Sequence, residues 1–138
     1  CTLSYFLKWS NQDNYYYTME NSKNFNISPE RTSGTYTKHQ GIDDKLDDLH
    51  YYTTLIKFGL GRASYDAAQE IRNGKITREE GINLVRKFDQ EFPSKYFNEF
   101  LEYIDISEDD FFKTINKFRS SHLWEKNGTE YSLKYLVS

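Results

Sequence analysis

The sequence YYTTLIKFGLGRASYD at residues 51–66 decides how this chain is expected to fold. Apolar side chains recur at helical spacing as far as Phe58, and Gly59 and Gly61 then interrupt the helix before a second helix begins. Glycine permits a tight turn and lets another group approach the backbone closely. The pattern therefore predicts a corner between two helices.

The charges around this corner allow two interpretations. Lys57 and Arg62 flank the glycines and could hold a phosphate or another anion at the start of the second helix. Asp66 lies one helical turn after Arg62 and is expected to orient it. A structural corner with solvated charges explains the same residues, and spacing alone favours that simpler interpretation because a short glycine motif is weak evidence.

Helical signals continue on both sides of the corner. Ser10, Thr77 and Ser107 are suited to cap helices, and Pro93 suits a first helical position. Together with the spacing of apolar residues, these signals predict helices at residues 11–20, 42–58, 63–73, 77–87, 93–103 and 107–119.

Strand signals occur only near the two ends. Weak alternation predicts a short strand at Leu3–Lys8, and the dipeptide Asn127-Gly128 predicts a hairpin between residues 123–126 and 130–135. Residues 21–41 are rich in Asn, Ser, Thr and Gly and predict a long loop. The expected fold is mainly α, a single helical domain over residues 1–138 with a short N-terminal strand and a C-terminal β-hairpin.

Composition limits the possible functions. The 138 residues carry a net charge of -3, which argues against binding to nucleic acid or to an anionic membrane. A single cysteine excludes an internal disulfide and a cysteine-based metal site. No apolar run is long enough to span a bilayer, so the cytoplasm is the expected location. With 12 Tyr and 10 Phe, the core is expected to contain many rings.

Individual residues suggest a ligand but no catalytic set. The loop RTSGTYTK at residues 31–38 combines a glycine, hydroxyl groups and cations, which suits a sugar or a phosphate as well as an ordinary polar loop. Tyr15, Tyr16 and Tyr17 can stack on a sugar or a base, although packing explains them equally well. The three histidines are far apart, no metal site is predicted, and no catalytic residue is assigned.

Several segments resemble the C-terminal part of the N-acetyl sugar amidotransferases. They are YFLKWS at residues 5–10, RTSGTYTK at 31–38, the long block at 42–89, FPSKYFNEFLEYIDIS at 92–107 and HLWEK at 122–126. The resemblance covers nearly the whole chain, and the long central block is its most specific part.

The resemblance implies a function. Such enzymes convert the acetamido group of a bacterial sugar, free or nucleotide-activated, into an acetamidino group for lipopolysaccharide O-antigen or for the pseudaminic acid of flagellin. They resemble PP-loop ATP pyrophosphatases: ATP with Mg²⁺ activates the amide oxygen, pyrophosphate is released, and ammonia from a glutaminase partner displaces AMP.

The family's N-terminal half carries an SGGxDS-type PP-loop and a cysteine motif, neither of which occurs in these 138 residues. The resemblance therefore implies the C-terminal part of a longer enzyme, inactive alone. It places Lys57 and Arg62 on phosphate, beside Gly59 and Gly61, and the loop residues Arg31, Tyr36 and Lys38 on an acidic sugar or on closure of the loop. A non-catalytic helical domain that docks a glutaminase or a scaffold protein is the alternative.

Overall fold

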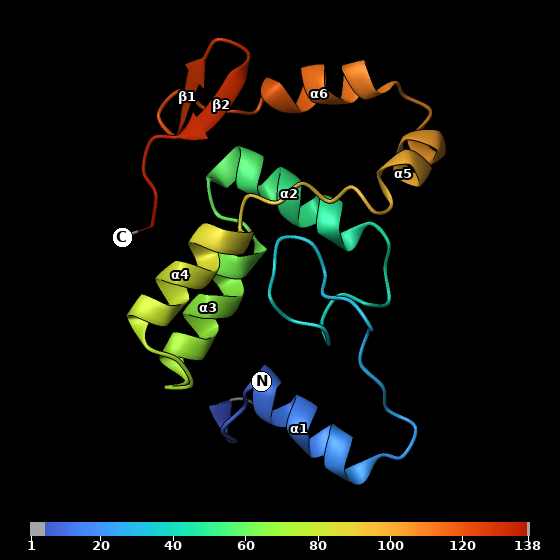
Figure 1. Cartoon of the computed structure of the whole chain (residues 1–138), viewed down its shortest axis with the longest axis vertical. Coiled ribbons are helices and arrows are strands. Elements are labelled where there is room, and N and C mark those ends of the chain that lie inside the picture. The colour runs from blue at the N-terminus through green and yellow to red at the C-terminus, as the bar shows by residue number, and fades with distance from the viewer. Residues whose placement is uncertain (1–4, 138) are drawn as a thin grey trace.

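The structure, a computed structural model, describes residues 5–137 as a mainly helical chain that ends in a β-hairpin (Figure 1). Its elements are α1 (Asn11–Asn21), α2 (Asp47–Phe58), α3 (Arg62–Arg72), α4 (Arg78–Phe88), α5 (Phe97–Ile104), α6 (Glu108–Asn116), β1 (Trp124–Asn127) and β2 (Glu130–Leu133). The predicted fold class is therefore confirmed, and residues 22–46 form the predicted long loop.

Helices α3 and α4 form the closest helix pair of the fold and lie side by side in Figure 1. The predicted capping box begins α4: the Thr77 hydroxyl accepts a hydrogen bond from the Glu80 amide at 3.2 Å, and the Glu80 carboxylate accepts one from the Thr77 amide at 2.8 Å. Gly81 faces α3, where a Cβ atom would lie 2.6 Å from Cδ1 of Ile71. The missing side chain is what lets the two helices approach.

Aromatic rings supply much of the core, as the composition predicts. Phe97 packs edge-on against Phe92 at 4.8 Å and against Phe111 at 5.1 Å between ring centres. The buried Trp124 closes this core from the hairpin, and its indole Nε1 donates a 2.8 Å hydrogen bond to the Ile56 carbonyl oxygen. Helix α2 thus holds α5, α6 and the hairpin on one side of the molecule.

The hairpin forms at the predicted dipeptide, with Asn127 paired to Glu130 in an antiparallel ladder. The strand predicted at Leu3–Lys8 is wrong where it can be compared: Tyr5–Lys8 form a turn and irregular backbone, whereas Leu3 and Ser4 lie outside the described residues. Among residues 5–137 the sheet consists of β1 and β2 alone, and neither strand pairs with this segment.

Two helices begin later than predicted. The helix expected from Ile42 begins at Asp47, after a turn in which the Asp44 carboxylate accepts a 2.7 Å hydrogen bond from the Leu46 amide. The helix expected from Pro93 begins at Phe97, because the preceding residues turn so that Phe92 packs on the core. In both cases local hydrogen bonds and packing override the helical spacing.

Within residues 5–137, the helices are too short and too polar for any of them to cross a lipid bilayer.

Candidate functional site

The glycine corner between α2 and α3 is closed by a carboxylate from the same chain. Gly59 ends α2 in the left-handed conformation (φ 75°), and Gly61 precedes α3 in extended backbone. The Asp89 carboxylate, at the end of α4, accepts hydrogen bonds from the Gly61 amide (2.9 Å), the Ser64 amide (2.9 Å) and the Ser64 hydroxyl (2.8 Å). An anion does sit at the start of α3, and it is Asp89.

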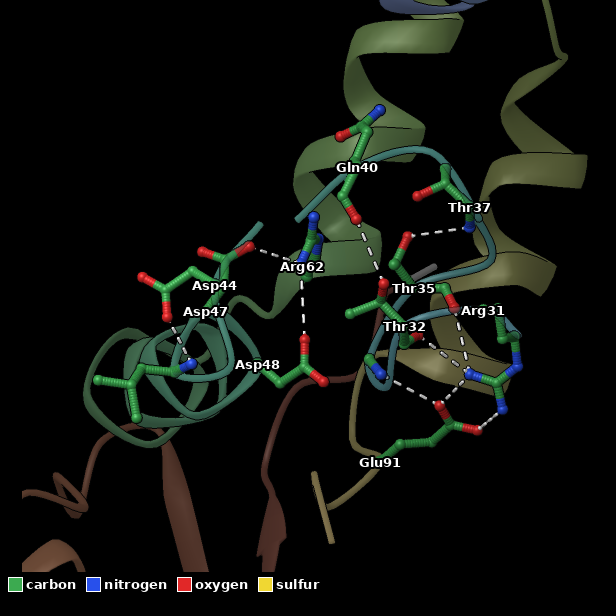
Figure 2. A network of polar contacts seen from close by, with 12 residues as sticks. Arg31, Thr32, Thr35, Thr37, Gln40, Asp44, Asp47, Asp48, Arg62 and Glu91 are labelled. Carbon is green, nitrogen blue, oxygen red and sulfur yellow. Dashed lines mark hydrogen bonds and ion pairs between the residues drawn. The ribbon is translucent and has the colours of Figure 1, made fainter. Parts of the chain in front are cut away.

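Arg62 also has internal partners. Its side chain is buried, and Nη1 lies 2.9 Å from Oδ2 of Asp47 and 3.8 Å from Oδ1 of Asp48, as Figure 2 shows. The guanidinium also lies 4.7 Å above the ring centre of Tyr51. Asp66, the partner expected from the sequence, forms no ion pair with Arg62. The Asp66 carboxylate instead accepts a 2.5 Å hydrogen bond from the Thr35 hydroxyl.

Lys57 does not converge with Arg62. It is exposed, lies 5.2 Å above the ring of Phe58 and lines a groove of about 350 Å³ between α2 and α6. With the turn amides bonded to Asp89 and Arg62 paired with aspartates, the corner does not fit a phosphate in this conformation. The geometry favours the structural interpretation of the corner.

The loop that carries Arg31 is latched to the end of α4. Both Arg31 terminal nitrogens donate to the Glu91 carboxylate at 2.5 Å, and the Gly34 amide donates to the same carboxylate at 3.1 Å (Figure 2). Burial acts to raise the pKa of Glu91, but these bonds hold it below its usual value. The Arg31 guanidinium also lies over the Phe88 ring at 4.6 Å. Arg31 thus fastens the loop to the residues that follow α4.

Beyond this latch, a cavity of about 490 Å³ opens between α1, the loop and α3. Tyr15 and Tyr16 from α1, Tyr36, Thr37 and His39 from the loop, and Glu70 from α3 are among its lining residues, together with Gln12, Ile27, Lys38, Lys75 and Ile76. One wall is a stack of Tyr15 on His39, with ring centres 4.5 Å apart and planes 18° apart. Helix α1 bounds the cavity without burying any residue of its own.

Three residues that line this cavity each carry a buried polar atom without an ordinary partner. The Thr37 hydroxyl and His39 Nε2 are buried and have no hydrogen-bond partner among the described residues. The Tyr36 hydroxyl lies near Glu70 but makes no hydrogen bond of good geometry with it. Leaving a buried polar group unpaired costs about 1–3 kcal/mol, so such groups are expected to bond to water or to a ligand.

Titratable groups around the cavity are shifted toward their neutral forms. Burial raises the pKa of Glu70, opposed by the neighbouring Tyr36 hydroxyl, and burial lowers the pKa of His39, opposed by the Asp66 charge. Burial, together with the nearby Glu70 and Asp66 carboxylates, raises the pKa of Tyr36 well above its usual value. Burial therefore disfavours the charged forms of Glu70, His39 and Tyr36 at the edge of this cavity.

A second cavity, of about 310 Å³, is lined by residues between Ser28 and Asp48 together with Lys95 and Tyr96, and both of its lysines are paired. Lys45 bonds to Glu99 at 2.6 Å, and Lys95 bonds to Glu30 at 3.3 Å. Burial raises the pKa of Asp48 in its wall, although Arg62 opposes the shift. No group of three or more His, Cys, Asp or Glu side chains in the described part of the chain is placed to hold a metal ion.

The structure thus divides the expected ligand-binding residues. Tyr36 and Lys38 line the larger cavity, whereas Arg31 and the corner residues do not. Thr37, His39 and Glu70 were not expected there. Thr37 belongs to the RTSGTYTK stretch and His39 directly follows it. Glu70 gives no sequence signal, because its part in the cavity depends on how α3 packs against the loop.

A comparison with known protein families identifies the family of this chain. Residues 33–136 match the sequence profile of a family described as the LPS biosynthesis protein WbpG-like, C-terminal domain. The chain belongs to this family. Its place is therefore in lipopolysaccharide biosynthesis, in agreement with part of the expected function. A search of curated proteins found no match.

The family match covers the corner, Glu91 of the latch, and residues Tyr36–His39 and Glu70 beside the cavity, but not Arg31. It begins at Ser33, so α1 with Tyr15 and Tyr16 lies outside the matched residues.

Proposed function

We propose that this chain is the C-terminal part of an ATP-dependent amidotransferase that converts an acetamido sugar into an acetamidino sugar for lipopolysaccharide O-antigen. Membership of a lipopolysaccharide-biosynthesis family supports the pathway. The resemblance of residues 42–89 to N-acetyl sugar amidotransferases supports the reaction. The pseudaminic acid of flagellin is a second glycan to which the same conversion applies.

In this proposal the chain faces the sugar rather than the nucleotide. The corner expected to hold a phosphate does not fit one, because Asp89 occupies the amides of Gly61 and Ser64. ATP and Mg²⁺ are therefore assigned to the rest of the enzyme. The observation that carries the sugar-facing role is the polar, aromatic cavity beside Tyr36 and Thr37.

The intact enzyme provides the test. With an acetamido sugar, ATP, Mg²⁺ and either ammonia or glutamine plus the glutaminase, mass spectrometry should detect a product in which an imino group replaces the carbonyl oxygen. AMP should form in equal amount. The 138-residue chain alone should form neither product; AMP formation by this chain alone would contradict its proposed place as the C-terminal part. No amidine from the intact enzyme with either nitrogen source would contradict the reaction.

One observation favours the docking alternative. Phe58 and Phe118 line the groove between α2 and α6, and they are 56% and 55% exposed. Exposed aromatic surface of this kind is common where proteins associate. If a glutaminase binds here, Phe118→Glu should abolish glutamine-dependent turnover of the intact enzyme and spare ammonia-dependent turnover. Equal loss of both activities, or of neither, would contradict docking at this groove.

A further inference from the structure

We infer that residues 5–9 pair as a β-strand with a sheet in the upstream half of the enzyme, and that α1 lies on one face of that sheet. The C-terminal helical domain then begins after α1, not at residue 1 as expected from the sequence. That an upstream half exists rests on the proposed function; that residues 5–19 form a surface to be covered rests on this structure.

The segment before α1 exposes nearly all of its large side chains. Tyr5 is 84% exposed, Phe6 66%, Leu7 57% and Trp9 48%, and the rings of Tyr5 and Phe6 contact each other, with centres 5.1 Å apart. Figure 1 shows this segment and α1 in blue, at the end of the molecule away from the hairpin. Single exposed apolar residues are normal, but an unbroken run of them marks a surface that another structure covers.

The residue types of the segment suit a strand buried on both faces. In an extended strand, Tyr5, Leu7 and Trp9 would point to one face of the sheet and Phe6 to the other. A nearly continuous apolar run is typical of strands in sheets that helices cover on both sides. No backbone hydrogen bond joins residues 5–9 to another part of the described chain, so the neighbour that a strand requires has to come from elsewhere.

Helix α1 has the same unpartnered character. It is attached to the rest of the chain by contacts near its exposed side, among them the pairing of Asp13 with Lys75 at 2.5 Å and the stack of Tyr15 on His39. The helix buries no residue of its own, and three of its large side chains are exposed: Tyr16, Tyr17 and Met19. Because helices in proteins owe most of their stability to packing of an apolar face, α1 is expected to pack on a further structure.

Two observations identify that structure as the upstream half. The profile of the C-terminal domain begins at Ser33, so the segment and α1 both lie outside the domain that the family shares. Ser10 caps α1 by accepting a 3.2 Å hydrogen bond from the Asp13 amide, so the helix follows the segment directly, in the order of a strand–helix unit. Peptide bonds also hold the upstream half close to this segment, whereas a second copy or a separate protein has to bind from solution.

Hydrogen exchange followed by mass spectrometry tests the pairing by comparing the intact enzyme with the 138-residue chain. The amides of residues 6–9 should exchange about 100-fold or more slowly in the intact enzyme than in the chain alone, since a sheet neighbour would then bind them. Equal exchange in the two proteins would overturn the assignment. Slow exchange in the chain alone that depends on its concentration would also overturn it, because the neighbour would then be a second copy.

Leu7→Asp tests burial of the side chains. In the intact enzyme it should speed exchange of these amides by about tenfold or more and lower the melting temperature, because it would bury a carboxylate. In the 138-residue chain it should leave the melting temperature unchanged, since Leu7 is exposed there. The matched control is Leu136→Asp, because Leu136 is 59% exposed and lies at the other end of the chain.

Leu136→Asp should leave exchange of residues 6–9 unchanged in both proteins. Equal effects of the two substitutions on that exchange in the intact enzyme would contradict a strand buried against the upstream half. An equal fall in the melting temperature of both proteins with Leu7→Asp would contradict it too, because Leu7 would then stabilise the 138-residue chain by itself.

The activity assay separates this inference from the proposed reaction. If the intact enzyme forms amidine but residues 6–9 exchange as fast as in the chain alone, the strand assignment fails and the reaction stands. If these amides are protected in the intact enzyme and no amidine forms, the strand assignment stands and the reaction fails.

Discussion

Replacing Asp89 with alanine should lower the free energy of unfolding more than any other aspartate-to-alanine change in this chain. Asp89 follows α4, yet its carboxylate caps the N-terminus of α3. Asp89 is only 6% exposed, and its carboxylate accepts three hydrogen bonds from Gly61 and Ser64. Hydrogen bonds to a charged group contribute about 1.5–3 kcal/mol each, but bonds that share one carboxylate are not additive. We expect Asp89→Ala to lower the free energy of unfolding by about 3–5 kcal/mol.

Urea unfolding followed by far-UV circular dichroism measures this loss. Asp109→Ala is the matched control, since Asp109 lies exposed in the first turn of α6 and should cost at most about 1 kcal/mol. Asp89→Asn keeps an acceptor oxygen without the charge and should fall between the two. A loss for Asp89→Ala no larger than that for Asp109→Ala would refute the internal cap. Recovery of Asp89→Ala stability by added phosphate would support it, because an anion would then replace the missing carboxylate.

Three further predictions concern the same region. Gly61→Ala should lower the free energy of unfolding, measured in urea, by about 2–3 kcal/mol, since its Cβ would lie 2.6 Å from the Asp89 carbonyl oxygen. The control, Gly74→Ala, would meet open space and should cost about 1 kcal/mol because Gly74 has a positive φ. Equal losses for the two variants would contradict the close approach at Gly61. Arg62→Ala should lower the free energy of unfolding by about 3 kcal/mol, near the lower end for a broken buried ion pair because the Asp47 side chain is 28% exposed; unchanged stability with lost activity would instead favour a ligand-binding arginine. Burial raises the pKa of the Asp66 carboxyl above its usual value, so the folded state binds more protons there than the unfolded state does. The stability that this protonation provides is lost as the pH rises through the folded-state pKa. Asp66→Asn should therefore stabilise the chain at pH 7, by an amount that shrinks as the pH is lowered toward 4; a gain that is independent of pH would contradict this.

Local signals predicted the helix ends that depend on neighbouring residues. Thr77 and Ser107 cap α4 and α6 because each hydroxyl reaches an amide three residues later. Asn127-Gly128 forms the hairpin because these two residue types readily adopt the backbone conformation of a tight hairpin turn. The beginnings of α2 and α5 were missed. Helical spacing extends further along the chain than the helices do, and packing of Phe92 on the core decides where α5 begins.

In the candidate site, too, the sequence predicted some features and packing decided others. Tyr36 and Lys38 were expected to face a ligand because a loop rich in hydroxyl groups and cations suits one, and both line the larger cavity. The corner at Gly59–Arg62 was expected either to hold a phosphate or another anion, or to be a structural corner with solvated charges. The structure places the Asp89 carboxylate against its amides, which neither interpretation named.

The sequence by itself determined the helical fold class, the capped helices, the hairpin and membership of a lipopolysaccharide-biosynthesis family. These depend on residues a few positions apart or on similarity along the whole chain. The tertiary structure alone decided which charges remain available. Asp89 reaches Gly61 across 28 residues, and Glu91 reaches Arg31 across 60, so both pairs exist only after α3, α4 and the loop have packed together. Packing supplied the anion at the corner and fastened Arg31 to Glu91, outside the cavity.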